Sequence, residues 1–165
     1  MDQYEITKAA RLFSDFIEDL SNWYIRRSRR YFQKPENKKE KEEPSQTLYQ
    51  VLMILSKLMA PFLPFISEEL YLKLKSPIKL SRGPESVHLC DFPKPKEKLI
   101  NKRLEEKMRK VREIVTLALA ERAKVKIKVR QPLILLKIKN QKLKIKNKEL
   151  LDLIKEEVNV KKDSF

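Results

Sequence analysis

One stretch of the chain, residues 19–32, combines basic, aromatic and amide side chains at spacings that a helix would bring together. On a helix of about 3.6 residues per turn, an exposed face then carries three arginines, two amides and an indole: Asn22, Trp23, Arg26, Arg29, Arg30 and Gln33. Arginine forks bind phosphate bidentately and stack on bases, and unpaired RNA bases stack on aromatic rings and offer their edges to amides. The spacing therefore predicts a ridge for single-stranded RNA. The alternative is a solvated helix face with Trp23 packed at a domain border.

Three further basic residues are weaker candidates for RNA contacts, namely Arg27, Lys128 and Arg130. Valines and lysines alternate over residues 124–130, a pattern typical of an extended segment. The basic side chains there could bind phosphates, or they could protect an exposed strand edge from pairing. The sequence leaves both interpretations open.

Other reactive side chains do not assemble into a predicted catalytic or metal site. His88 and Cys90 are the only histidine and cysteine, and a structural zinc site needs four ligands. Glu68 and Glu69 are adjacent on a predicted helix, where neighbouring side chains diverge, so we interpret them as helix-start charges. We therefore expect no catalytic residue, no metal site and no cofactor-binding residue in this chain.

The charge of the chain favours a polyanionic partner. Lys and Arg number 38 against 23 Asp and Glu, a net charge of +15, which suits nucleic acid. Residues 1–95 hold 16 basic and 13 acidic side chains, whereas residues 96–165 hold 22 and 10. No apolar run approaches the roughly 20 residues of a membrane-spanning helix, and residues 1–10 show no export signal. We expect a cytoplasmic monomer without a membrane partner.

The first half of the sequence predicts three helices. Residues 2–33 form the first, with a buried stripe at Ile6, Ala10, Phe13, Ile17, Leu20, Tyr24 and Tyr31. The polar residues 34–45, bounded by Pro35 and Pro44, are expected to form a loop. A second helix starts at Ser45 or Thr47 and ends at Met59, and a third covers 65–75 with Pro64 in its first turn.

Residues 76–95 are expected to be a connector with an extended piece at 87–89, and a fourth helix spans 98–123. Its buried stripe consists of Leu99, Leu104, Met108, Val111, Val115, Ala118 and Leu119. Four amphipathic helices predict a mainly α fold, an antiparallel helical bundle over residues 1–123.

The sequence pattern changes from a helical to a two-residue period at Lys124. Strands are expected at 133–139 and 143–146 around the turn signal Asn140-Gln141, then a helix at 149–157 and a last strand at 158–165. Residues 124–165 are therefore predicted to form a separate small α+β unit, which is incomplete if the chain is a fragment.

Ordered motifs along nearly the whole chain resemble those of isoleucyl-tRNA synthetases. The most specific motif is Leu-Ser-Asn-Trp-Tyr-Ile-Arg-Arg-Ser-Arg-Arg at 20–30. It is followed by Gln-Thr-Leu-Tyr at 46–49, Leu-Met-Ala-Pro-Phe-Leu-Pro-Phe at 58–65, Glu-Ser-Val-His-Leu at 85–89, Val-Arg-Glu-Ile-Val at 111–115 and Ile-Lys-Val-Arg-Gln-Pro-Leu at 127–133. The resemblance implies the anticodon-binding type of class I synthetase bundle and the start of the C-terminal extension of this family.

The resemblance also implies a function. Such a chain would bind the anticodon stem and loop of isoleucine tRNA and would act with the catalytic domain of the same synthetase, which uses ATP and Mg. The ATP-site signatures His-Ile-Gly-His and Lys-Met-Ser-Lys-Ser are absent from this sequence, as is the editing domain, so the chain alone should be inactive. The alternative is a free-standing basic helical module for RNA binding or protein interaction. In-frame ATP-site motifs upstream in the coding sequence would exclude that alternative.

Two positions depart from the pattern of the family. Gln33 stands where an aromatic residue is common, and Lys126 stands where glycine is frequent. The first difference affects stacking at the end of the ridge, and the second affects the turn that leads into Ile127.

Overall fold

The computed structural model describes residues 5–75, 83–138, 145 and 147–164. The fold is mainly α, as the sequence predicted. Two compact units, Met1–Pro95 and Lys96–Phe165, emerge from the backbone contacts, and each is described by itself. We predicted a domain boundary between residues 123 and 124, where the period of the apolar residues changes from helical to two residues. This boundary stays a prediction, and so does the antiparallel arrangement of the helices.

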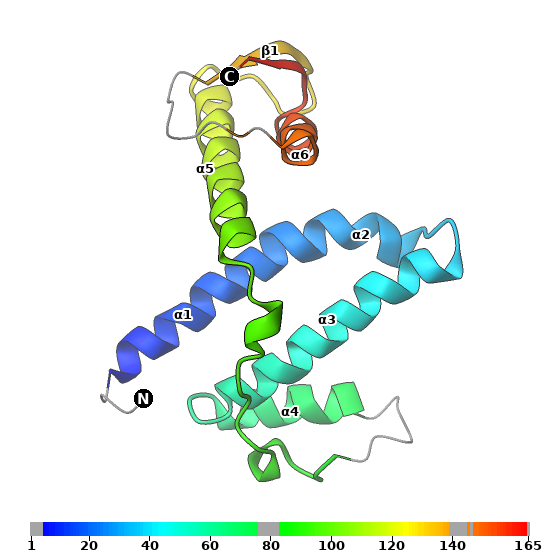
Figure 1. Ribbon diagram of the computed structural model, residues 1–165, viewed down its shortest axis with the longest axis vertical. Helices are drawn as coiled ribbons and strands as arrows, with labels where there is room; N and C mark the ends of the chain where they lie inside the picture. The colour runs from blue at the N-terminus through cyan, green and yellow to red at the C-terminus, as the bar shows by residue number, and fades with distance from the viewer. Residues whose placement is uncertain (1–4, 76–82, 139–144, 146, 165) are drawn as a thin grey trace. The chain divides into compact units, whose positions relative to one another are not determined.

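The first unit begins with one long helical rod, followed by two further helices (Figure 1). The rod consists of α1 (Ile6–Asp19), a π-helical segment η1 (Leu20–Ile25) and α2 (Arg26–Gln33), so the predicted first helix is confirmed. α3 (Lys38–Met59) and α4 (Pro64–Lys75) follow. α3 packs against both α2 and α4.

The predicted loop at 34–45 is wrong over most of its length, because α3 already begins at Lys38. Asn37 caps the helix, its Oδ1 accepting the backbone N–H of Glu40 at 2.9 Å. Pro44 lies inside α3 and forfeits one backbone hydrogen bond. Ion pairs one turn apart, such as Lys38–Glu42 at 3.5 Å, support this polar start.

The apolar stripe predicted for the first helix is only partly buried. No residue of α1 is buried, and Ile6 and Ile17 are exposed. Phe13 contacts Phe62 edge to face, with ring centroids 5.3 Å apart. Elsewhere the apolar side chains of α1 and α3 line an open hollow of about 380 Å³ instead of closing it. Tyr31, on α2, is also exposed.

The turn at Pro61 and the start of α4 at Pro64 agree with the prediction. A core cluster of Ala60, Tyr71 and Val87 joins α3, α4 and the connector. Val87 lies in a 3₁₀ turn, η2 (Val87–Leu89), so the predicted extended piece is wrong. The turn is favoured because the Oγ of Ser86, its N-cap residue, accepts the backbone N–H of His88 at 3.2 Å.

Two polar side chains of α4 hold the connector. The carboxylate of Glu68 accepts the Ser86 hydroxyl at 2.9 Å and the Val87 N–H at 2.8 Å, so Glu68 is an anchor and not simply a helix-start charge. The Tyr71 hydroxyl donates to the backbone oxygen of Pro84 at 2.9 Å. Burial, followed by hydrogen bonding to Cys90, raises the pKa of Tyr71 to about 12.

The second unit consists of η3 (Glu97–Leu99), α5 (Lys102–Lys124), β1 (Leu133–Lys137), α6 (Lys148–Val158) and β2 (Val160–Ser164) (Figure 1). α5 starts four residues later than predicted, because Asn101 caps it through the Leu104 N–H at 3.0 Å. Leu99 therefore precedes the helix and is exposed, as is Leu104. The later members of the predicted stripe, Val111 and Val115, are buried.

β1 and β2 pair in parallel, with Leu133 opposite Val160, and α6 lies between them in sequence. The predicted strand at 133–139 is confirmed as β1 and the predicted helix at 149–157 as α6. The last strand, predicted at 158–165, begins only at Val160, because α6 continues through Val158 and Asn159 ends it in a left-handed conformation. The predicted turn at Asn140-Gln141 lies outside the described residues, as does the strand at 143–146 apart from Ile145, which is buried.

A buried arginine joins the end of α5 to this sheet. Arg122 is 3% exposed, and its guanidinium donates to the backbone oxygens of Lys128, Gln131 and Asn159 at 2.9–3.1 Å. Between Arg122 and β1 the chain turns at Lys126, whose φ is 55°. Glycine adopts that left-handed conformation most easily. The lysine at this position, where glycine is frequent in the family, therefore costs backbone conformational energy.

Candidate nucleic-acid interface

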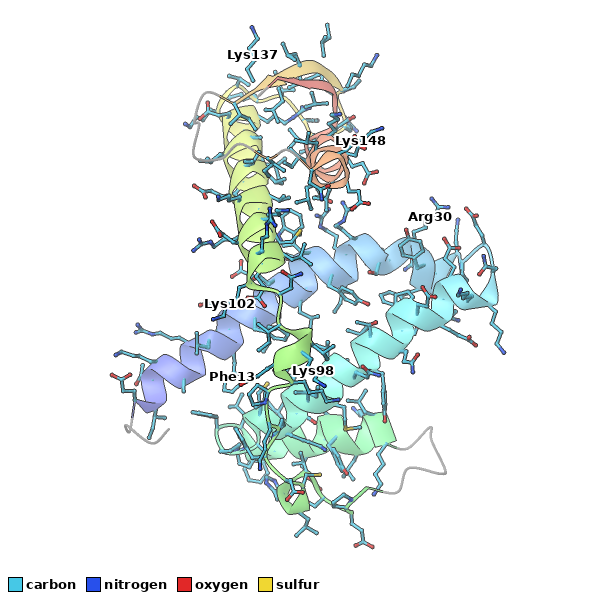
Figure 2. The ribbon with its side chains drawn as sticks, viewed as in Figure 1. Phe13, Arg30, Lys98, Lys102, Lys137 and Lys148 are labelled. Atoms are coloured by element: carbon cyan, nitrogen blue, oxygen red, sulfur yellow. The ribbon has the colours of Figure 1, made fainter. Side chains whose placement is uncertain are left out.

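The six residues predicted to bind RNA, here called the arginine ridge, lie on η1 and α2. They are Asn22, Trp23, Arg26, Arg29, Arg30 and Gln33. All are exposed except Trp23, which is half-buried. Figure 2 labels Arg30 near the end of α2, close to the turn into α3.

The π-helical segment changes the hydrogen bonding of the rod at the start of the ridge. The backbone N–H of Arg26 donates to the oxygen of Ser21, five residues earlier, instead of the usual four. The backbone oxygen of Asn22 accepts a hydrogen bond from the side-chain Nε–H of Arg26 at 2.7 Å. This bond holds the Arg26 side chain against the rod, and π-helical turns of this kind are frequent at functional sites.

Arg26 also lies beside the indole of Trp23, with the guanidinium carbon 6.0 Å from the ring centroid. A cation at this distance from a Trp ring gains about 0.5–1 kcal/mol at an exposed site. Arg26 is therefore oriented from two sides, by the Asn22 oxygen and by the indole. The sequence spacing predicted that these residues are neighbours, and the structure adds the contacts.

The two faces of α2 differ in character. Arg26, Arg29 and Gln33 recur at helical spacing on the exposed face. Ser28, on the opposite face, is buried where α2 packs against α3. The Tyr24 hydroxyl, one turn earlier, donates to the backbone oxygen of Pro44 at 3.0 Å. The packing of α2 on α3 thus leaves the basic side chains outward.

An acidic neighbour accompanies the last arginine of the ridge. Arg30 Nη2 forms an ion pair with Glu36 Oε1, and both side chains are largely exposed. The backbone N–H of Glu36 in turn donates to Glu40 Oε2 at 2.6 Å. The turn between α2 and α3 therefore holds a carboxylate against the ridge.

The weaker candidates lie in two places. Arg27 is half-buried on α2, whereas Lys128 and Arg130 are exposed in the turns between α5 and β1. These turns are not the regular strand that the alternation at 124–130 indicated. The hydrogen bonds from Arg122 to the Lys128 and Gln131 oxygens fold the segment back, which explains the difference.

A polar hollow of about 480 Å³ between the rod and the start of α3 was not predicted from the sequence. The rod contributes Tyr24, Ser28 and Tyr31. α3 contributes Glu40, Glu43, Pro44 and Thr47. Glu40, Glu43 and Pro44 fall in the segment 34–45 that we predicted to be a loop, so the apolar pattern did not indicate the hollow. The available signal was Asn37 followed three residues later by Glu40, a helix-start pattern.

Metal-binding clusters and membrane-spanning helices are both absent from the part of the chain that the structure describes. No cluster of three or more His, Cys, Asp or Glu side chains there is placed to hold a metal ion. No helix in the described ranges has both the length and the apolar character needed to cross a bilayer.

Comparison with known proteins gives a consistent result. The family model described as the anticodon-binding domain of tRNA ligase matches residues 1–139. Isoleucine–tRNA ligases of Chlamydia trachomatis and Chlamydia muridarum are each 46% identical over the whole chain, and that of Chlamydia pneumoniae is 43% identical. The chain spans 16% of the length of these relatives. The predicted resemblance is confirmed, and the chain belongs to the family of anticodon-binding domains of tRNA ligases.

Proposed function

We propose that the chain binds the anticodon stem and loop of isoleucine tRNA through the arginine ridge. The observation that carries the proposal is the outward face of α2, where arginines recur at helical spacing opposite the face packed on α3. Guanidinium groups on a rigid helix can contact successive phosphates and stack on unpaired bases. Trp23 supplies a stacking surface, and Asn22 and Gln33 supply amides for base edges.

The relatives are isoleucine–tRNA ligases, so the proposed context is a ligase whose catalytic domain joins isoleucine to its tRNA in the cytoplasm with ATP and Mg. In that context this chain is a monomeric binding part that holds the far end of the tRNA and positions it for the reaction elsewhere. Because the chain carries no ATP-site signature, it contributes binding and orientation, not chemistry.

Nuclease footprinting of isoleucine tRNA with the purified chain tests the proposal. The expected result is protection confined to the anticodon arm, weakened in Arg29→Ala and unchanged in Arg109→Ala. Arg109 is an exposed arginine on α5 and therefore a matched control for the change in charge.

Protection of the acceptor arm, or equal protection of unrelated tRNAs, would contradict the proposal. Equal protection would instead favour the alternative, a basic module without tRNA selectivity.

A further inference from the structure

We propose that the second unit binds a small aliphatic carboxylate in an apolar pocket between α5 and the β1–β2 sheet, and that the guanidinium of Arg122 receives the carboxylate. This inference goes beyond RNA binding, because the arginine ridge belongs to the first unit and the pocket to the second. The pocket has a volume of about 440 Å³, which lies within the range of small-ligand pockets.

The lining of the pocket is almost entirely aliphatic. Its most deeply buried members, Ile114, Val158 and Val160, come from α5, the end of α6 and β2. Leu117 of α5 and Leu135 of β1 also line the pocket and are 53% and 40% exposed, so an apolar ligand would cover surface that now faces water. Burial of such surface favours binding, and apolar cavities take up apolar molecules in preference to water. The lining therefore selects an aliphatic ligand.

One cation lies among these aliphatic side chains. Arg122 is 3% exposed and lines the same pocket. The three acceptors of its guanidinium are neutral backbone oxygens, so these bonds leave the positive charge uncompensated. Arginine keeps that charge in proteins, and burial of a charge without a counter-charge is unfavourable. A ligand that brings one negative charge into the pocket would compensate it.

The guanidinium also has a donor to spare. Nη1 and Nη2 of Arg122 make the three hydrogen bonds, whereas the buried Nε has no partner within the described residues. A buried donor without a partner destabilises the fold. A carboxylate oxygen at Nε would form a charge-assisted hydrogen bond, which is stronger than a neutral one. Because Nε is shielded from water, the side chains around it must shift slightly to admit that oxygen.

Two other charged side chains line the pocket, but both face water. Glu121 forms an ion pair with Lys124 at 2.6 Å, and both side chains are 69% exposed. Lys137, labelled on β1 in Figure 2, is exposed as well. Water weakens the interaction of exposed charges with a ligand, whereas a buried guanidinium attracts an anion more strongly. The carboxylate should therefore bind at Arg122.

Isothermal titration calorimetry of the full chain with decanoate, below the concentration at which it forms micelles, tests the inference. We expect decanoate to bind at least about tenfold more tightly than decanamide, because only the carboxylate compensates the charge of Arg122. Butanoate should bind at least about tenfold more weakly than decanoate, because each buried methylene adds to the affinity. Equal affinities for decanoate and decanamide, or no binding of decanoate, would overturn the inference.

Two alanines of α5 provide matched variants. Ala118 lines the pocket, whereas Ala120 is exposed and does not line it. Ala118→Trp should fill part of the pocket and weaken decanoate binding at least about tenfold. Ala120→Trp should leave the affinity within about twofold of the original. Equal effects of the two changes would show that decanoate binds elsewhere, and circular dichroism verifies that α5 is intact in both variants.

The role of Arg122 can be tested without replacing it. In the chain labelled with ¹⁵N at arginine Nε, the buried Arg122 Nε–H should be identifiable by its slow exchange with water. Decanoate should shift this signal, and decanamide should shift it less. An unchanged signal at saturating decanoate would contradict the inference. So would loss of the preference for decanoate over decanamide in Lys137→Gln, because the carboxylate would then bind at Lys137. None of these outcomes bears on RNA binding by the first unit.

Discussion

The side-chain Nε of Arg26 donates to the backbone oxygen of Asn22 at 2.7 Å, across the π-helical segment that opens the arginine ridge. The bond fixes the first arginine of the ridge before any ligand arrives. Fixing a side chain in advance lowers the entropy cost of binding. Arg26 should therefore contribute more to affinity than an equally exposed but untethered cation.

Removing arginines from the ridge should weaken RNA binding and flatten its dependence on salt. Each lost phosphate contact lowers the slope of log K against log salt by roughly 0.7–0.9. Arg26→Ala and Arg29→Ala should each show this in titrations of the anticodon arm at several salt concentrations. Lys128→Ala and Arg130→Ala test the other basic segment. A larger loss from the latter pair, at equal fold stability, would place the binding surface on the second unit.

Trp23 and Arg26 should act as a coupled pair in binding. Trp23→Ala removes a stacking surface that contributes about 1–3 kcal/mol per base, and it also releases the Arg26 guanidinium. A double-mutant cycle with Arg26→Ala should therefore give a coupling free energy of at least about 0.5 kcal/mol. Additive effects in the cycle would show that the two side chains act independently. Trp23→Phe, which keeps a ring, is the control for lost packing.

Glu68 should contribute more to the stability of the first unit than the adjacent Glu69 does. Its carboxylate accepts two hydrogen bonds from the connector, and hydrogen bonds to charged groups contribute about 1.5–3 kcal/mol each. Both bonds end on the same oxygen, Oε2, so Glu68→Gln can keep them through its amide oxygen but loses the charge, and it should lower the free energy of unfolding by about 1–2 kcal/mol. Glu69→Gln removes only an exposed ion pair with Lys73 and should cost less than about 1 kcal/mol. Urea denaturation measures both, and equal losses would contradict the anchoring role.

Replacing Lys126 by glycine should stabilise the second unit. A left-handed conformation costs a non-glycine residue about 1–2 kcal/mol, and the greater freedom of glycine in the unfolded chain offsets about 0.5–1 kcal/mol. The net gain expected in urea denaturation is about 0.5–1 kcal/mol. Lys124→Gly, two residues earlier in the last turn of α5, should have the opposite sign. A loss of stability in Lys126→Gly would show that the lysine side chain has a role beyond the turn.

Alkaline pH should destabilise the fold through Tyr71. The pKa of Tyr71 is about 12 in the folded state, compared with an ordinary value of 10.0, because burial favours the neutral phenol. The folded state then holds the proton that the unfolded state releases, so this stabilisation is full below pH 10 and is lost as pH rises to about 12. Tyr71→Phe should remove that part of the pH dependence in urea midpoints. Tyr31→Phe, on the exposed part of α2, should leave it unchanged.

The sequence predicted the elements that have strong periodic patterns. The rod at the N-terminus, the start of α4 at Pro64 and the buried half of α5 all follow from apolar spacing or from proline placement. The ridge was found in the same way, because exposed residues at helical spacing stay together whatever the rest of the fold does. Its role in RNA binding stays a prediction.

The start of α3 could not be read from periodicity, because its first turns are polar on all sides. Charges and Pro44 normally indicate a loop, yet Asn37 and one-turn ion pairs keep the segment helical. The role of Glu68 depends on a contact 18 or 19 residues away in sequence. Likewise the π-helical register at Leu20–Ile25 has no signature in residue spacing. Tertiary contacts determine such features, and the residue pattern of a single sequence does not predict those contacts.

The acceptors of Arg122 also bear on how the protein is made. The guanidinium donates to oxygens of Lys128, Gln131 and Asn159, and β2, the strand that pairs with β1 within the described residues, is formed by residues 160–164. A ribosome adding roughly 5–20 residues per second leaves α5 with an unsatisfied cation for seconds. The first unit, Met1–Pro95, is compact by its own backbone contacts and can fold during that interval. We therefore expect synthesis to proceed with a folded first unit followed by a second unit that folds late, and a nascent chain is most open to proteolysis or misassociation in that interval.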